Sequence, residues 1–146
     1  MKIYEILEDI AIATIVLTQV PINNFFSINQ NIGIHRGQWA YPFIGSLIGF
    51  FLFLTIVLLD SFGIPHNVSI LISLSIGIIL TGALHEDGFA DFFDSLGGKD
   101  YPVRQKILKD SRLGSFGVLS LIIVFILKFS LLSELDHPLT LACALI

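Results

Sequence analysis

The chain has 146 residues, of which 54% are hydrophobic and only 14% are charged, and its mean hydropathy is +0.85. Soluble domains usually have about 45–50% apolar and about 25% charged residues, so this composition indicates an integral membrane protein. A formal charge of −4 gives no sign of a basic surface for nucleic acid. Because Cys143 is the single cysteine, a disulfide framework and a cysteine-based metal site are excluded.

Four apolar segments follow one another along the chain. A hydrocarbon core about 30 Å thick takes about 20 helical residues to cross. We expect residues 3–20 to span the membrane, although Glu5, Glu8 and Asp9 leave an interfacial helix as the alternative. The next three segments are 40–59, 64–84 and 116–135. The sequence therefore predicts an all-α, polytopic transmembrane helical bundle with about four membrane segments, forming one domain over residues 1–146.

A basic loop sets the expected orientation in the membrane. Most of the Lys and Arg residues lie between the third and fourth segments: Lys99, Arg104, Lys106, Lys109 and Arg112. Since cytoplasmic loops carry an excess of Lys and Arg, this loop is expected on the cytoplasmic side. The candidate active-site region, 85–115, then faces the compartment that contains nucleotides and Mg²⁺.

An acidic block begins this region, at the end of the third apolar segment. Its members are Glu86, Asp87, Asp91 and Asp94. On a helix the three aspartates fall within roughly a 60° arc, and Glu86 lies about 80° away. Carboxylates beside hydrocarbon are costly without a cation, and clustered carboxylate oxygens suit Mg²⁺ or Mn²⁺. The alternative interpretation is that these carboxylates are simply solvated at the end of the helix.

Basic residues follow the acidic block after Gly97-Gly98. Arg and Lys opposite a bound metal would neutralise the remaining charge of a diphosphate. For any one of these residues, the alternative is a role in membrane topology alone. Lys128, the one cation inside the fourth segment, is expected to snorkel or to face the bundle interior.

Two blocks of sequence resemble a known family. They are TGALHEDGFADFFDSLGG at 81–98 and ILKDSRLGSFG at 107–117, with a weaker block, YPFIGSLIG, at 41–49. Together they are similar to the cobalamin-5′-phosphate synthases, also called adenosylcobinamide-GDP ribazoletransferases. The resemblance implies a multi-pass enzyme of the bacterial inner membrane that requires Mg²⁺. Such an enzyme transfers the cobinamide-phosphate group of adenosylcobinamide-GDP to the 5′-hydroxyl of α-ribazole, or to α-ribazole 5′-phosphate, and releases GMP.

The resemblance also assigns roles to residues by matching position. Glu86, Asp87, Asp91 and Asp94 become metal ligands, with Glu86 and Asp94 also catalytic, and Lys109, Asp110 and Arg112 lie on the phosphate side of the substrate. Asp94 is the expected general base, because it ends the acidic face nearest the basic loop. The implied partners are the two substrates and membrane lipid, and the resemblance leaves open a homo-oligomer or association with other cobalamin-pathway enzymes.

Several departures and alternatives accompany this interpretation. Gln19 stands where the family usually has a basic residue, which puts a phosphate contact from the first loop in doubt. Family members are longer, and the final apolar run, 139–146, is too short to span, so we expect the chain to be truncated.

One alternative is a CDP-alcohol phosphotransferase, whose usual motif has Arg where this chain has Asp91. Another is a divalent-cation transporter, which would distribute acids over several helices.

Overall fold

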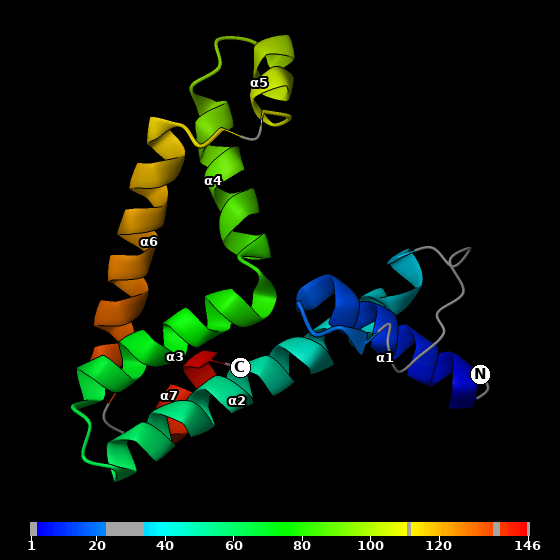
Figure 1. The fold of residues 1–146 in the computed structure, drawn as a ribbon. Helices are drawn as coiled ribbons and strands as arrows, with labels where there is room; N and C mark the ends of the chain where they lie inside the picture. Colours follow the sequence, from blue (N-terminus) through cyan, green and yellow to red (C-terminus); the bar gives the residue numbers. More distant parts are fainter. Residues whose placement is uncertain (1–2, 23–33, 111, 136–137, 146) are drawn as a thin grey trace. The chain divides into compact units, whose positions relative to one another are not determined.

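The computed structural model describes residues 3–22, 34–110, 112–135 and 138–145, and every regular element in these ranges is helical. The elements are α1 (Ile3–Leu17), the 3₁₀ helix η2 (Ile34–Ala40), α2 (Tyr41–Ser61), α3 (His66–Thr81), α4 (Leu84–Leu96), α5 (Tyr101–Ile107), α6 (Ser115–Ser133) and α7 (Pro138–Leu145). Figure 1 shows them in chain order. The predicted all-α class is confirmed.

The chain divides into two compact units. Unit 1 comprises Met1–Gly82 together with Leu135–Ile146, and unit 2 comprises Ala83–Glu134. The boundary coincides with two consecutive residues in the left-handed region, Gly82 at φ 66° and Ala83 at φ 59°. Two such residues in sequence end a right-handed helix, so α3 stops at Thr81 and α4 begins as a separate helix.

Unit 1 contains a buried acidic residue that is paired with a cation. Asp9, on α1, is only 4% exposed. Arg36 Nε, from η2, lies 2.7 Å from Asp9 Oδ1, and Trp39 Nε1 donates a hydrogen bond of 3.0 Å to Asp9 Oδ2. Arg36 also lies 3.4 Å from the carboxylate of Glu8. The acids that interrupt the first apolar segment are therefore partly neutralised by η2.

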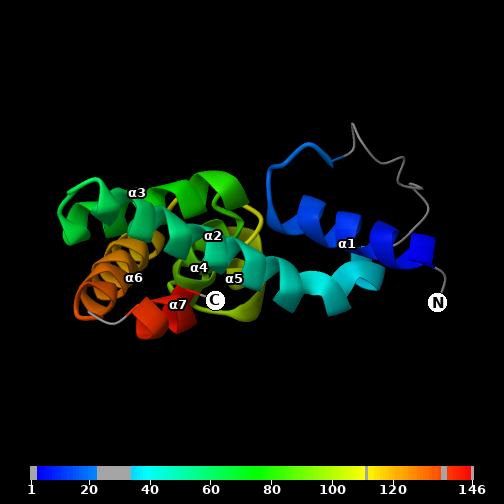
Figure 2. The same ribbon diagram turned by 90° about the horizontal axis from the view of Figure 1, so that it is seen from below.

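The helices α2 and α3 pack as an antiparallel hairpin in unit 1, as both ribbon views show (Figures 1 and 2). Ser73 Oγ donates a hydrogen bond of 2.9 Å to the Leu52 carbonyl, which ties the two helices together. Near the turn, His66 Nδ1 and Asp60 Oδ2 lie 2.8 Å apart. The outer faces of this hairpin remain apolar and exposed, as expected for helices that contact lipid.

Two helical segments of the described chain are long and apolar enough to cross a membrane. They are His35–Ser61, which contains α2, and Ser115–Ser133, which is α6; a third is counted if α3 and α4 form one broken span. These match the predicted segments 40–59 and 116–135 closely. The predicted segment 64–84 instead ends at Thr81 because of the two left-handed residues, and α1 ends at Leu17 rather than at residue 20.

Unit 2 consists of two antiparallel helices and a short connecting helix. In Figures 1 and 2, α4 and α6 lie side by side, and α5 sits in the connection between them. Asp100 caps α5 by accepting a 3.0 Å hydrogen bond from the Val103 N–H. Arg104 Nε donates a 3.0 Å hydrogen bond to the Gly98 carbonyl and so fastens α5 to the end of α4.

Candidate functional site

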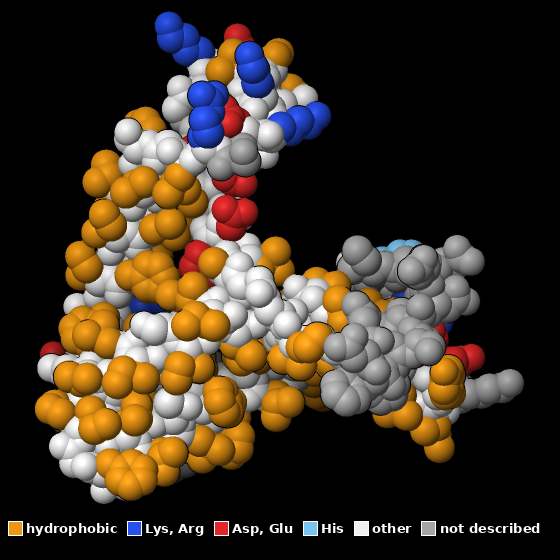
Figure 3. All heavy atoms as spheres, in the orientation of Figure 1, with side chains coloured by type: hydrophobic (Ala, Val, Ile, Leu, Met, Phe, Trp, Pro, Cys, Tyr) orange, Lys and Arg blue, Asp and Glu red, His pale blue; other side chains and the backbone are white. Residues whose placement is uncertain are grey.

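The acidic block lies on α4, as the spacing predicts, and its aspartates differ in depth. Asp87 is exposed, Asp91 is half-buried and Asp94 is buried, at 9% exposure. Glu86 and Asp87 occupy the first turn of α4, where the helix dipole favours negative charge. Figure 3 shows acidic side chains along unit 2 and Lys and Arg side chains gathered around the region of α5.

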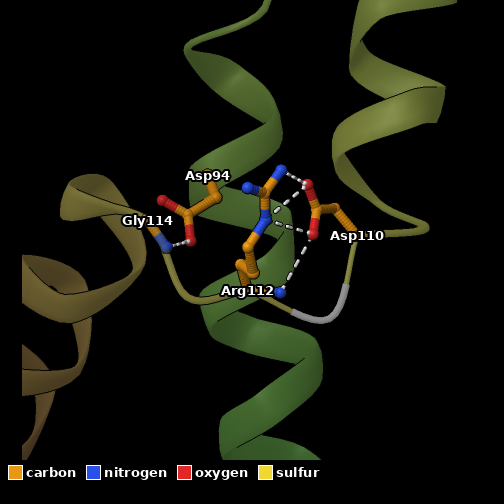
Figure 4. Close-up of polar contacts among 4 residues, drawn as sticks. All are labelled: Asp94, Asp110, Arg112 and Gly114. Atoms are coloured by element: carbon orange, nitrogen blue, oxygen red, sulfur yellow. Dashed lines mark hydrogen bonds and ion pairs between the residues drawn. The ribbon is translucent and has the colours of Figure 1, made fainter.

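Asp94 joins α4 to the start of α6. The Gly114 N–H donates a 2.7 Å hydrogen bond to Asp94 Oδ2, and the Gly117 N–H donates a 2.8 Å hydrogen bond to Oδ1. Gly114 is the N-cap residue of α6 and has no side chain to cap that helix. The Asp94 carboxylate therefore satisfies two N–H groups at the N-terminus of α6 from a neighbouring helix (Figure 4).

Glycine is required at both donor positions because the carboxylate approaches the backbone so closely. A Cβ added at Gly114 would overlap Asp94 Oδ1, and one added at Gly117 would overlap Asp94 Oδ2 and lie 3.0 Å from the Ala90 carbonyl oxygen. Sequence reasoning identified Asp94 but missed its two glycine partners. The only signal was the Gly-Ser-Phe-Gly spacing at 114–117, which does not reveal a partner 20 residues upstream.

The basic loop contains an internal ion pair. Arg112 donates to Asp110 through Nε at 3.0 Å and through Nη2 at 2.6 Å, and the Arg112 backbone N–H donates at 3.2 Å. These hydrogen bonds from the Arg112 side chain and backbone lower the pKa of Asp110 to about 2. In Figure 4 the Arg112 guanidinium is bonded to Asp110, whereas Asp94 is bonded to Gly114. The structure thus brings together two of the three residues expected on the phosphate side.

Arg112 and Lys109 are positioned differently. Arg112 is held by Asp110 but keeps 86% of its side chain exposed. Lys109 is also exposed and follows the end of α5. Exposed cations on this connection remain accessible to an anion from outside the protein.

The described residues contain no preformed group of three or more His, Cys, Asp or Glu side chains close enough to hold a metal ion. The predicted metal set of Glu86, Asp87, Asp91 and Asp94 therefore stays a prediction. The donor chemistry fits Mg²⁺, which binds proteins through one or two carboxylates and completes its coordination with water and substrate phosphates.

Unit 2 also has a groove between α4 and α6 that sequence reasoning did not anticipate. Its volume is about 280 Å³. His85, Glu86 and Lys128 provide its polar lining, beside apolar residues of both helices. Glu86 Oε2 is buried and has no hydrogen-bond partner among the described residues.

These features define a class of protein: an all-helical membrane protein with an acidic helix face followed by a basic connection. The sequence matches the family described as "Cobalamin-5-phosphate synthase" over residues 9–146, and the chain belongs to that family. It is 35% identical over 137 residues to an adenosylcobinamide-GDP ribazoletransferase of Bradyrhizobium diazoefficiens, covering 93% of this chain and 52% of the relative. It is 37% identical over 147 residues to one of Rhizobium etli, covering 99% and 56%.

A third relative with the same name, from Shewanella oneidensis, is 40% identical over 119 residues, covering 81% of this chain and 45% of the relative. The chain thus spans about half the length of the curated relatives it matches. No solved structure matches the chain. The resemblance inferred from the blocks at 81–98 and 107–117 is confirmed at the level of the family.

Proposed function

We propose that the chain carries the nucleotide-diphosphate site of an adenosylcobinamide-GDP ribazoletransferase. In this reaction a free ribose hydroxyl of α-ribazole, or of α-ribazole 5′-phosphate, loses its proton and forms a new bond to the phosphorus attached to cobinamide, and the bond from that phosphorus to GMP breaks. The products are GMP and adenosylcobalamin, or adenosylcobalamin 5′-phosphate. The observation that carries the proposal is the pairing, within unit 2, of an acidic face on α4 with an exposed basic connection, in a chain of this family.

The residues of the acidic face are proposed to hold Mg²⁺. Asp87 and Asp91 have the accessible carboxylates, and Glu86 and Asp94 complete the proposed set. Each oxygen of Asp94 keeps a further lone pair beside its backbone hydrogen bond, so its place in the set is chemically permitted. When bound, Mg²⁺ would neutralise charge on the bridging oxygens of the diphosphate.

The protein's own residues would bind and orient the substrate. Arg112 and Lys109 would contact the phosphate oxygens that the cation leaves uncompensated. Asp110 would hold the Arg112 guanidinium in place through its paired hydrogen bonds. Asp94 is the proposed acceptor of the proton from the attacking hydroxyl, with Glu86 as the second catalytic carboxylate. We place this site on the cytoplasmic side of the bacterial inner membrane, where GTP-derived substrates occur.

A transferase assay tests the proposal. The chain is reconstituted in liposomes with adenosylcobinamide-GDP, α-ribazole and Mg²⁺, both alone and fused to the part of the Rhizobium etli relative that it does not cover. We expect Mg²⁺-dependent release of GMP, its loss in Asp91→Asn, and its retention in Glu134→Gln, a matched removal of an exposed carboxylate at the end of α6. A folded fusion that releases no GMP would contradict the proposal, and uptake of Mn²⁺ into the liposomes without GMP release would identify a divalent-cation transporter.

A further inference from the structure

Two opposite charges line the groove between α4 and α6. Glu86 belongs to the first turn of α4, and Lys128 lies within the apolar sequence of α6. Both residues line this groove, whose volume is about 280 Å³. Glu86 Oε2 is buried there without a hydrogen-bond partner, and Lys128 makes no hydrogen bond or ion pair with any residue that the structure describes. The buried oxygen of Glu86 therefore lacks a partner, and Lys128, an exposed residue, is a cation that lines the same groove.

The geometry of the two helices brings these side chains to the same level. The hydrogen bond that the Gly117 N–H donates to Asp94 Oδ1 joins the antiparallel helices α4 and α6 at one end. From that point Glu86 lies eight residues along α4, about 12 Å, and Lys128 lies 11 residues along α6, about 16 Å. Helical side chains lean toward the N-terminus of their helix, so Glu86 leans away from the junction and Lys128 leans back toward it. The two side chains consequently converge.

The positions of Glu86 and Lys128 around their helix axes also direct the two side chains toward each other. Eleven residues complete about three turns, so Lys128 returns to within about 20° of the face that Gly117 presents to α4. Ala90, one turn after Glu86, is fully buried, and its carbonyl lies against Gly117. Glu86 and Lys128 thus both project from the surfaces on which α4 and α6 pack together.

We propose that Lys128 is the charge partner of Glu86 across this groove and that it acts as a positioning residue for the Glu86 carboxylate. An ammonium group inside an apolar helix and a buried carboxylate oxygen compensate each other at lower cost than either alone. The pairing itself rests on the groove, while its consequence for catalysis rests on the proposed function, in which Glu86 is a catalytic and metal-binding carboxylate.

A double-mutant cycle tests the pairing without turnover. We expect Glu86→Gln and Lys128→Met each to lower the melting temperature in detergent by about 5 °C, because each removes one member of the pair and leaves the other charge without its partner beside the apolar helices. The double variant should melt close to the wild type, and Lys128→Arg should as well. Ile126→Met, on the exposed side of α6, is the matched control and should change nothing. Additive effects, a Lys128→Met variant that melts like Ile126→Met, or a double variant that does not fold would overturn the inference.

Activity distinguishes this inference from the proposed function. If the transferase reaction is present, Lys128→Met should lower kcat by about tenfold to a hundredfold, as does the loss of a group that orients a ligand, and Lys128→Arg should restore it. If the melting cycle shows coupling but no form of the protein releases GMP, the pairing stands and the proposed function fails. If GMP is released but the cycle is additive, the pairing alone is wrong.

Discussion

Replacing Gly117 with alanine tests the junction between α4 and α6 directly. The added methyl group would occupy the space of Asp94 Oδ2, so the carboxylate must retreat from the backbone N–H groups of Gly114 and Gly117. A hydrogen bond to a charged group contributes about 1.5–3 kcal/mol, so the loss of two costs about 3–6 kcal/mol. Alanine in place of glycine within a helix returns about 1 kcal/mol, which leaves a net loss of about 2–5 kcal/mol.

The measurement is thermal unfolding in detergent, followed by helical circular dichroism. A loss of this size should lower the melting temperature by at least about 5 °C. Gly88→Ala is the matched control, because Gly88 lies inside α4 and a Cβ there would have nothing within 4 Å. Its melting temperature should stay the same or rise slightly. If Gly117→Ala were as stable as Gly88→Ala, the Asp94 carboxylate would not be held against the start of α6.

Three further outcomes follow from local contacts. The pKa of Asp110, measured by carboxyl NMR, should be about 2 and should return toward 3.8 in Arg112→Ala. Because this pKa is lowered in the folded state, the contribution of the Asp110–Arg112 pair to folding stability is complete above about pH 4 and is lost as the pH falls through about 2. Arg36→Gln should destabilise unit 1 by about 3 kcal/mol in chemical denaturation, since it leaves Asp9 buried without its cation, whereas Arg36→Lys should cost less. Ala83→Gly should raise stability by about 0.5–1 kcal/mol in calorimetry, because glycine relieves the left-handed strain at φ 59°. An unchanged stability in that variant would argue against strain at the boundary between the units.

The apolar helices were predictable because their signal is local. Hydropathy over about 20 residues located α2 and α6 to within two residues at each end. The same signal overextended the third segment to Leu84, since apolar composition continues past Thr81 while the backbone turns at Gly82 and Ala83. Periodicity likewise placed the acidic residues on one helix, because i, i+4 and i+7 spacing needs no tertiary information.

The partners of the charged residues were not predictable in the same way. Arg36 reaches back to Asp9 across 27 positions, and Gly117 reaches back to Asp94 across 23. No short sequence pattern specifies contacts over such distances, because they depend on how helices pack. The pairing of Asp110 with Arg112 is the exception, since the partners are only two positions apart in the chain and an Asx-type turn suffices.

The carboxylates of the acidic face differ in how far hydrogen bonds offset their charge, and this difference predicts which of them contribute most to metal binding. The charge of Asp94 is partly met by two N–H groups at the start of α6, whereas Asp87 and Asp91 are more accessible and make no such bonds among the described residues. Two carboxylates are enough for Mg²⁺ when substrate phosphates supply further ligands. With Mn²⁺ as the paramagnetic probe, Asp87→Asn and Asp91→Asn should each weaken binding by about tenfold or more, while Asp94→Asn should weaken binding less and should also lower the melting temperature. A larger loss of Mn²⁺ affinity in Asp94→Asn than in the other two variants would instead place Asp94 at the centre of the metal site.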